Sequence, residues 1–462
     1  MAASTEFIAR WASEYPREET EQVFFEASIG LLDAIGCMVA GSGEEPVSIV
    51  IDAVTNWGGG PASILGRGLS LAAPWAAMVN GVACHVLDYD DSFAPLVGHV
   101  SAPIVPAILA LAEERGLSGG DVLDAYVIGV EIAASVGRSV NPVHYSDGWH
   151  STSTIGVIAG AAACSRLLRG SPEVFRNAIS LAVSQAAGTR VQLGSPAKSF
   201  HAGLAAKSAI IAAVMAERGL SAAGEALDSR WGFGDMYARG FADSGKELPE
   251  NADNLAIRNP GIIFKPYPTC GSTHRSLNSI LDLRTRYGFG SGEVEAVELV
   301  IPKVNYNNLG FPDPQTGMEA RFSLQYCSAL ALAHGSVRPV DFSDEAAKRP
   351  DLRPLMGRIS VGELNEGDEN TDYLSLPAHC TIRLKDGREL RDTRFARLGS
   401  REAPLAREEH LKKFEECAAP VIGPENTAKA QAMIMNLFDE PDLVGLMTML
   451  RDMRNPEHRQ TV

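Results

Sequence analysis

Apolar residues recur at three- and four-residue spacing over most of the first 240 residues of this sequence. The pattern predicts helices in residues 1–41 and a further helix up to about Trp57. Residues 74–240 then form a succession of alanine- and glycine-rich segments separated by glycine turns. Their small side chains let neighbouring helices approach closely. The first half of the chain therefore predicts a helical bundle.

The spacing of apolar residues changes near residue 261, where alternation with a period of two begins. Alternation of apolar and polar residues predicts strands at 294–301, 358–362 and 379–384. Between the first two of these strands, helical spacing predicts a helix at 320–333. Residues 385–388 contain an Asp-Gly pair that predicts a tight hairpin into a last strand at 389–393. Residues 261–400 are thus expected to form an α/β unit of different character.

Helical spacing returns after about Pro404, in residues 408–417 and 425–438. We expect these helices to rejoin the first bundle, because they share its amphipathic pattern. With 462 residues, the chain also exceeds the usual size of one compact core, so two domains are expected.

The net charge of −16 argues against nucleic acid as a partner. It would also repel an acidic metabolite unless lysine, arginine and histidine residues outweigh it locally. Seven scattered cysteines without a CxxC pair predict neither a disulfide scaffold nor a zinc site. No segment has the unbroken apolar composition of a membrane span, and the first residues lack the pattern of a signal peptide. We therefore expect a cytoplasmic protein without a membrane partner.

Residues 80–99 gather polar side chains at the end of a helix that is otherwise apolar. A spacing of four residues places one set of them on a single helical face, namely Asn80, Cys84, Asp88 and Ser92. Pro95 disfavours helical geometry before it, so the helix is expected to end near Phe93 or Ala94. Three neighbouring carboxylates raise one another's pKa, which suits proton transfer near neutral pH. An acidic helix end that faces water is the open alternative.

Four later stretches also place chemically active side chains in apolar surroundings. They contribute His150, Lys198 with His201, Lys265 with Cys270, and Tyr326. Capping histidines and ordinary surface lysines are the alternatives, and Cys270 with His274 forms only a weak zinc pattern. No nucleotide, flavin or iron–sulfur motif is found, so no cofactor is expected. Together these residues suit proton transfer beside a carboxylate group, with lysines binding the anionic substrate.

Several longer motifs combine these residues in a specific order. They are Asn80-Gly followed by His85 and Asp88-Tyr-Asp-Asp-Ser92, Gly98-His99, Gly148-Trp-His150, Lys198-Ser-Phe-His-Ala-Gly203, Lys265-Pro-Tyr-Pro-Thr-Cys-Gly-Ser-Thr-His274 and Phe322-Ser-Leu-Gln-Tyr326. Through them the chain resembles the MmgE/PrpD family, which includes 2-methylcitrate dehydratase, cis-aconitate decarboxylase and iminodisuccinate epimerase. The resemblance implies a mostly α fold, in which a large helical domain (residues 1–260 and 402–462) carries an inserted α/β lid (residues 261–401). It also implies a homodimer that uses no metal or organic cofactor.

The resemblance also implies roles for individual residues. Positions of the decarboxylase active site are matched by Asp88, Ser92, His99, His150, Lys198, Lys265 and Tyr326. Asp88 and His150 are expected to transfer protons, with His99 and Tyr326 also acting in catalysis, the latter from the lid. Substrate binding is expected from Ser92, Lys198, Lys265, Cys270 and His201, while His99 also stabilises carboxylates.

Two differences bear on the reaction. Cys270 stands where the decarboxylase branch has a histidine, and the loop from Ser92 to His99 is one residue longer. The sequence around these positions is more similar to that of the epimerase branch. We expect a cofactor-independent, dehydratase-type lyase that acts on a small di- or tricarboxylate. The alternatives are an epimerase of an iminodisuccinate-like dicarboxylate and a non-catalytic polycarboxylate-binding protein.

Overall fold

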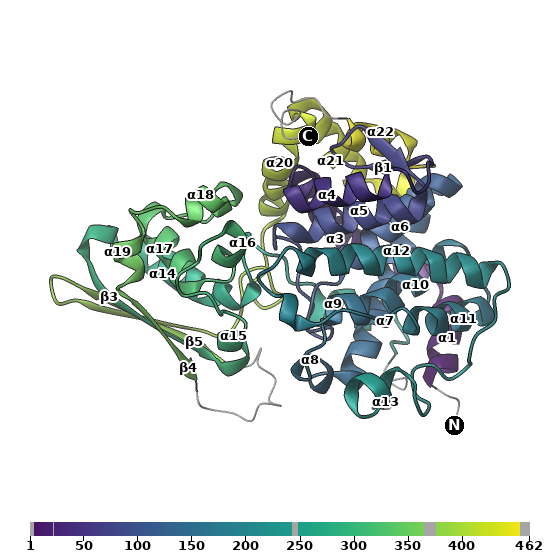
Figure 1. The fold of residues 1–462 in the computed structure, drawn as a ribbon, viewed down its shortest axis with the longest axis horizontal. Helices are drawn as coiled ribbons and strands as arrows, with labels where there is room; N and C mark the ends of the chain where they lie inside the picture. The colour runs from purple at the N-terminus through teal and green to yellow at the C-terminus, as the bar shows by residue number, and fades with distance from the viewer. Residues whose placement is uncertain (1–3, 22, 243–247, 365–375, 453–462) are drawn as a thin grey trace.

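The structure, a computed structural model, describes residues 4–21, 23–242, 248–364 and 376–452, and most of these are helical (Figure 1). Buried apolar side chains form two separate cores. The members of the first lie between Ile8 and Ile262 and between Phe414 and Leu450, and those of the second between Leu277 and Leu390. We call the surrounding parts the helical body and the sheet body. The prediction of a mostly helical protein with a small sheet is confirmed, whereas the domain limits at 261 and 401 stay a prediction.

The helical body contains both ends of the described chain. Its longer helices are α1 (Ser4–Glu14), α3 (Phe24–Gly41), α4 (Glu45–Val54), α5 (Ala73–Val86), α6 (Ser101–Arg115), α7 (Gly119–Val140), α10 (Gly156–Leu167), α11 (Pro172–Val183), α12 (Ala197–Glu217), α20 (Arg407–Ile422), α21 (Pro424–Met435) and α22 (Val444–Arg451). Short helices α2 (Arg17–Glu21), α8 (Val143–Ser146), α9 (Ser151–Thr154) and α13 (Phe233–Ala238) join them. A short strand, β1 (Ala62–Ile64), pairs antiparallel with β2 (Leu69–Leu71).

Helices α5 and α12 approach each other closely because glycine faces glycine between them. A Cβ atom on Gly81 would lie 2.8 Å from the Cα atom of Gly203. A Cβ atom on Gly203 would lie 2.3 Å from the carbonyl oxygen of Met78, which no side chain could tolerate without displacement of a helix. This contact brings the end of α5, which precedes Asp88, beside the first turn of α12, which carries Lys198.

Two helices are long and apolar enough, judged by length and composition, to cross a membrane. They are α3 and α12, and most of the apolar window of each is buried. Both pack against α5 in the first core. In this structure they are therefore core helices.

The sheet body has a four-stranded mixed sheet with the strand order β4-β3-β5-β6. Its elements are α14 (His274–Tyr287), β3 (Val294–Pro302), α15 (Lys303–Asn307), α16 (Gly317–Ala320), α17 (Leu324–His334), α18 (Asp344–Ala347), α19 (Arg353–Met356), β4 (Ile359–Leu364), β5 (Ala378–Leu384) and β6 (Glu389–Arg394). Strands β3 and β4 are parallel, and β5 is antiparallel to both β3 and β6. The predicted hairpin at residues 385–388 is confirmed, since it joins β5 to β6.

Among the described residues, helices cover one face of this sheet and leave the other uncovered (Figure 1). The burial of β5 alternates: Ala378, Cys380, Ile382 and Leu384 are buried, and the residues between them are not. Helices α14 and α17 lie against the buried face. The predicted helix at 320–333 is divided into two, because the Ser323 hydroxyl accepts the backbone N–H of Tyr326 and starts α17 anew.

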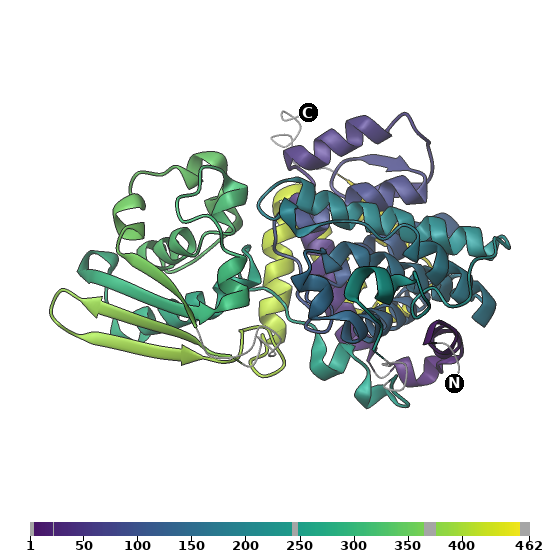
Figure 2. The same ribbon diagram turned by 60° about the horizontal axis from the view of Figure 1, so that its bottom comes forward.

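The chain passes between the two bodies twice, near residues 262–266 and 395–404, and the two passages contact each other. The N–H of Phe264 donates to the carbonyl oxygen of Gly399 at 3.0 Å. Ile263 also forms a two-way backbone bridge with Ser92. Figure 2 shows α20 running along the boundary between the bodies. The first passage is thus fixed against the loop that follows α5.

Candidate active site

Asp88 lies just beyond the end of α5, which is shorter than predicted. The helix ends at Val86 rather than near Phe93, and Asp88 has a left-handed φ of +50°. Two distant cations explain the early end: Arg321 donates to the carbonyl oxygen of Leu87, and Lys265 to that of Asp88. The predicted helical face that joins Asp88 to Ser92 is therefore wrong. A left-handed non-glycine residue is strained and is maintained by such surrounding contacts.

The Asp88 carboxylate binds two lysines in the interior of the protein. Its Oδ1 atom lies 3.0 Å from Nζ of Lys198 and 2.8 Å from Nζ of Lys265, and all three side chains are almost fully buried. Burial alone would raise the pKa of Asp88, but the two ammonium groups hold it well below its usual value. Asp88 is therefore ionised at neutral pH. The sequence-based expectation that neighbouring acids raise its pKa is wrong for this residue.

The raised pKa values belong to the next two carboxylates instead. Burial raises the pKa of both Asp90 and Asp91 to about 7. Asp91 accepts hydrogen bonds from Ser101 and from the N–H of Val100 at the start of α6, and Asp90 lies 2.7 Å from Nδ1 of His85. The acidic cluster is thus buried, so the alternative of a helix end facing water is excluded.

His99 presents one ring nitrogen toward Asp88. Its Nδ1 atom is 2.5 Å from the carbonyl oxygen of Asp91. A carbonyl can only accept, so Nδ1 carries the hydrogen and Nε2, which lies 3.8 Å from Oδ1 of Asp88, has a free lone pair. Burial, Lys265 and His85 lower the pKa of His99 well below its usual value. His99 is a neutral imidazole able to accept a proton.

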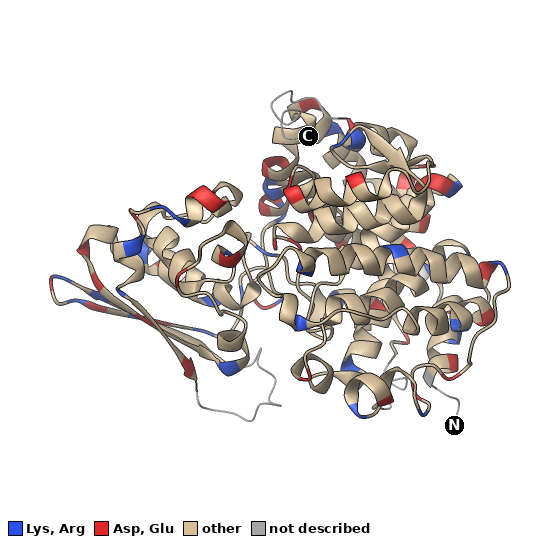
Figure 3. Ribbon diagram, viewed as in Figure 1, with Lys and Arg blue, Asp and Glu red and all other residues tan. Residues whose placement is uncertain are grey.

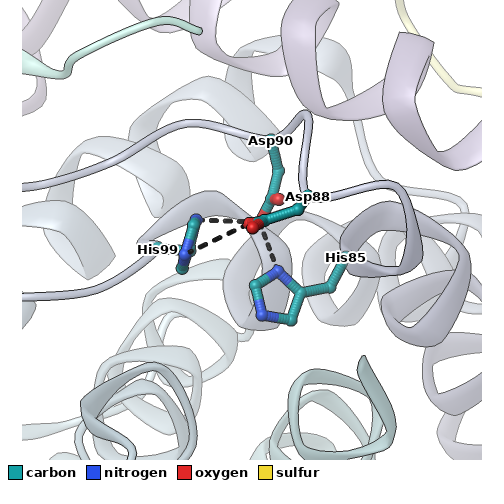
Figure 4. A group of neighbouring side chains, drawn as sticks. All are labelled: His85, Asp88, Asp90 and His99. Carbon is teal, nitrogen blue, oxygen red and sulfur yellow. Dashed lines mark hydrogen bonds and ion pairs between the residues drawn. The ribbon is translucent and has the colours of Figure 1, made fainter. Parts of the chain in front are cut away.

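Four side chains of this region have the ligand types of a metal site. Figure 4 shows the carboxylates of Asp88 and Asp90 between the rings of His85 and His99, and one ligand atom from each lies within 4.8 Å of the others. Two features weigh against a cation here. Two ammonium groups already contact Asp88, and Nδ1 of His99 donates to a carbonyl. The arrangement fits a cluster neutralised by lysine better than a metal centre.

His150 lies on the other side of His85 and contacts a fourth histidine. The His85 and His150 rings are stacked with centroids 5.8 Å apart, and Nδ1 of His150 is 3.1 Å from Nδ1 of His201. Burial, His85 and Lys198 lower the pKa of His150 well below its usual value. His150 is therefore also a neutral imidazole at neutral pH.

A small pocket of about 80 Å³ lies between the two bodies, and four of these groups line it: Asp88, His99, His150 and Lys198. The helical body contributes Asp88, Ser92, His99, Tyr145, His150, Thr152 and Lys198 to its lining. The sheet body and the second passage contribute Cys270, Ser272, Asn305, Asn308, Phe322 and Arg397. Among the lining residues the cations are Lys198 and Arg397, and the one carboxylate is Asp88. Acidic and basic residues elsewhere are interleaved along the described chain, as Figure 3 shows.

The structure brings most of the predicted residues together, although not all line the pocket. Ser92 and Cys270 line it directly, and burial raises the pKa of the Cys270 thiol, so this group is uncharged. Lys265 and His201 do not line the pocket. Lys265 is buried against Asp88, and His201 contacts His150, which does line it. Tyr326 is different, because it lies in the second core.

The predicted placement of Tyr326 in the site has no support in the geometry. Its side chain is fully buried among second-core residues, and its hydroxyl donates to the carbonyl oxygens of Asp341 and Ala346. A hydroxyl engaged by two backbone carbonyls cannot also act on a substrate. Tyr326 therefore organises the sheet body.

Sequence reasoning missed several groups in and around the pocket. Arg397 lines the pocket but belongs to none of the motifs found in the sequence. Asn308 of the sheet body accepts hydrogen bonds from Tyr145 and Arg190 of the helical body and so connects the two across the pocket. His85 belongs to the first motif, but only the fold shows that its ring lies between the other two, edge-on to His99 and stacked with His150.

Comparison with known proteins places both halves of the chain in the same family. The MmgE/PrpD N-terminal domain matches residues 6–244, and the MmgE/PrpD C-terminal domain matches residues 267–439. Human cis-aconitate decarboxylase is 30% identical over 84% of this chain and 82% of its own length. The mouse enzyme of the same name is 28% identical over 91% and 88%, and the Aspergillus terreus one 25% identical over 96% and 95%.

Proposed function

Because the chain belongs to the MmgE/PrpD family, we propose that it is a lyase of the decarboxylase or dehydratase type that acts on a small tricarboxylate. The observation that carries this proposal is the pocket in which ionised Asp88 holds two lysines beside the neutral imidazoles of His99 and His150. Cis-aconitate is the first substrate to test, since the relatives are named for its decarboxylation.

The charge balance supports an anionic substrate. One carboxylate faces two lysines, so this group of three carries a net positive charge, and Arg397 adds to it across the pocket. Buried ammonium groups that already have a fixed partner need no reorganisation when an anion arrives. The carboxylates of a substrate would therefore bind at Lys198 and Arg397, although the protein as a whole has a charge of −16.

The neutral imidazoles supply the proton transfer. In decarboxylation of cis-aconitate, the bond to the carboxylate on the methylene carbon breaks and carbon dioxide leaves. The released electron pair shifts the double bond by one carbon, and the former alkene carbon takes up a proton. A bound trianion raises the pKa of a nearby imidazole, so His99 or His150 can carry that proton to the substrate. In a dehydration, the same imidazole would act as a base: it would take a proton from the carbon beside a carboxylate, the C–O bond on the neighbouring carbon would break, and the hydroxide would leave as water with a proton from solvent.

We further propose that the sheet body closes over the substrate as a lid. The pocket is lined from both bodies, and Asn308 reaches Tyr145 and Arg190 across it. Closure around the substrate would exclude water and strengthen its interaction with the lysines. The same residues would perform the reaction without a metal or organic cofactor, and activity in the presence of EDTA tests this part.

An epimerase is the second candidate, and Cys270 is the observation that favours it. Its thiol lines the pocket in uncharged form, so it can donate a proton. Removal of a proton by an imidazole and return of another from the thiol would invert a carbon beside a carboxylate. This reaction requires the two groups to reach opposite faces of the substrate.

Turnover of a substrate panel in D2O, followed by NMR, tests the proposal. The panel contains cis-aconitate, citrate, 2-methylcitrate and iminodisuccinate. His150→Gln should reduce turnover by about 100- to 10,000-fold, as removal of a general acid–base group does. His144→Gln is the matched control, because His144 is buried but bonds only to Tyr237 and Thr154 among the described contacts.

Each outcome points to one account. Release of carbon dioxide or water from a tricarboxylate supports the lyase. Deuterium incorporation without net product favours the epimerase. Tight binding of one member of the panel, with neither exchange nor turnover, favours a non-catalytic binding protein.

The oligomeric state and the cellular location are also part of the proposal. We propose a homodimer, as the family resemblance implies, and a cytoplasmic location, as expected from the sequence composition. One chain has a mass of 49.2 kDa, so sedimentation velocity should give a species of about twice that mass. A monomer over the working concentration range would contradict the dimer without affecting the lyase proposal.

A further inference from the structure

Lys413 of α20 uses all three of its N–H groups inside the protein. Its Nζ atom donates to Oδ1 of Asp33 at 2.7 Å and to the carbonyl oxygens of Tyr89 and Lys265 at 2.8 and 3.0 Å. Nζ also lies 3.9 Å from the centroid of the Tyr89 ring. One side chain thus joins four segments: α3, the loop after α5, the first passage between the bodies, and α20.

The two carbonyl oxygens belong to the backbone that carries the site. Tyr89 directly follows Asp88, whose left-handed backbone needs support from its surroundings. Lys265 is the residue whose own ammonium group binds Asp88. Lys413 therefore holds the main chain beside both members of this ion pair, while touching neither of their charged groups.

This arrangement is more specific than the packing of a core helix requires. The side chains of Lys413 and Asp33 are 6% and 3% exposed, and an apolar pair of the same size would fill that space without the desolvation of two charges. An apolar pair could not donate hydrogen bonds to two carbonyl oxygens on different segments. The buried charges thus provide directed contacts that apolar residues lack.

Lys413 also occupies a particular place in the fold. Figures 1 and 2 show α20 at the boundary between the helical body and the sheet body. Helix α20 begins a few residues after the second passage, which ends near residue 404. The same helix therefore contacts the first passage through Lys413 and follows directly from the second.

We propose that Lys413, with Asp33 as its counter-ion, is a positioning residue that fixes the Asp88–Lys265 ion pair in its working geometry. The inference rests on the proposed function only for its kinetic readout. A shift of about 1 Å in a reacting group lowers turnover by about 100-fold, and this is the loss we expect in kcat when the contact is removed. KM should change less, because Lys198 and Arg397 still bind the substrate.

The test removes both charges together, in Asp33→Asn with Lys413→Met, so that no unpaired charge stays buried. Hydrogen–deuterium exchange is then measured by mass spectrometry on peptides that cover residues 86–93 and 262–268. Exchange in both should rise by at least about tenfold, while α3 and α20 keep the protection of the wild-type protein. Lys412→Met is the matched control, because Lys412 lies next in the same helix and is 74% exposed beside Glu416.

The exchange result decides the proposal without any substrate. Unchanged exchange in both peptides of the folded double variant would overturn it, as would full wild-type kcat in an active enzyme. Faster exchange in both peptides supports it even if the substrate panel gives no turnover, in which case only the proposed function fails. If the double variant does not fold, Lys413→Gln with Asp33→Asn restores one hydrogen bond and is judged by the same measurements.

Discussion

Replacement of Asp88 by asparagine tests the charge arrangement at the centre of the site. The change keeps the shape of the side chain but leaves two buried ammonium groups about 3 Å from a neutral amide. Removal of one member of a buried ion pair costs about 3–5 kcal/mol. The amide oxygen of Asp88→Asn still accepts one hydrogen bond, so we expect a loss of about 3 kcal/mol in the free energy of unfolding at pH 7.

The pH dependence follows from the lowered pKa of Asp88. A carboxylate whose pKa is lower in the folded than in the unfolded state stabilises the protein above its unfolded pKa, about 3.9. This contribution is lost as the pH falls through the folded pKa. The difference between the wild-type protein and Asp88→Asn should therefore be constant from pH 7 to about pH 5 and shrink only below about pH 4.

Urea denaturation at several pH values measures this difference directly. Asp253→Asn is the control, because the Asp253 side chain is 83% exposed beside Arg258 and exposed pairs contribute less than about 1 kcal/mol. A loss below about 1 kcal/mol in Asp88→Asn at pH 7 would refute the reasoning. It would mean that Asp88 is protonated or that water, rather than Asp88, stabilises the two lysines.

Three further predictions concern other parts of the structure. The pKa of Asp90 in the folded protein is about 7, above its unfolded value, so the folded state binds a proton more tightly than the unfolded state. The free energy of unfolding therefore falls as the pH rises from about 4 to 7. Urea titrations should show that Asp90→Asn lessens this fall by roughly 1 kcal/mol per pH unit. Gly203→Ala places a Cβ atom 2.3 Å from the carbonyl oxygen of Met78, so it should cost about 1–3 kcal/mol in the same assay, and an unchanged stability would contradict the close helix contact. Limited proteolysis should cut near residues 261 and 401, a tricarboxylate should slow the cutting, and cleavage confined to residues 80–240 would contradict the domain scheme.

The sequence predicted the parts of the fold that depend on local patterns. Alternation in residues 379–384 and the Asp-Gly pair after them were enough to predict the β5–β6 hairpin. The early end of α5 could not be predicted in this way. It depends on Lys265 and Arg321, which lie 177 and 234 residues away from their carbonyl partners.

In the site, too, local sequence patterns predicted the residue types, but long-range contacts decide their chemistry. The residue types around Asp88 predicted an acid–base cluster near neutral pH. Which carboxylate is ionised depends on contacts between distant segments, since Lys198 and Lys265 lower the pKa of Asp88 while Asp90 keeps a raised one. Tyr326 shows the converse, because a motif position alone does not reveal that its hydroxyl is occupied by the main chain of the sheet body.

Calorimetric titration with propane-1,2,3-tricarboxylate tests the central claim, a tricarboxylate pocket built on buried lysines, most directly. This saturated compound has the charges of the proposed substrate but lacks its double bond. We predict binding of one molecule per chain, weakened about 10- to 100-fold in Lys198→Ala, as the loss of a charge-assisted hydrogen bond requires. Lys207→Ala should bind normally, because Lys207 lies on the same helix but packs over Trp75. Absence of binding to the wild-type protein, or equal affinity in all three proteins, would contradict the claim.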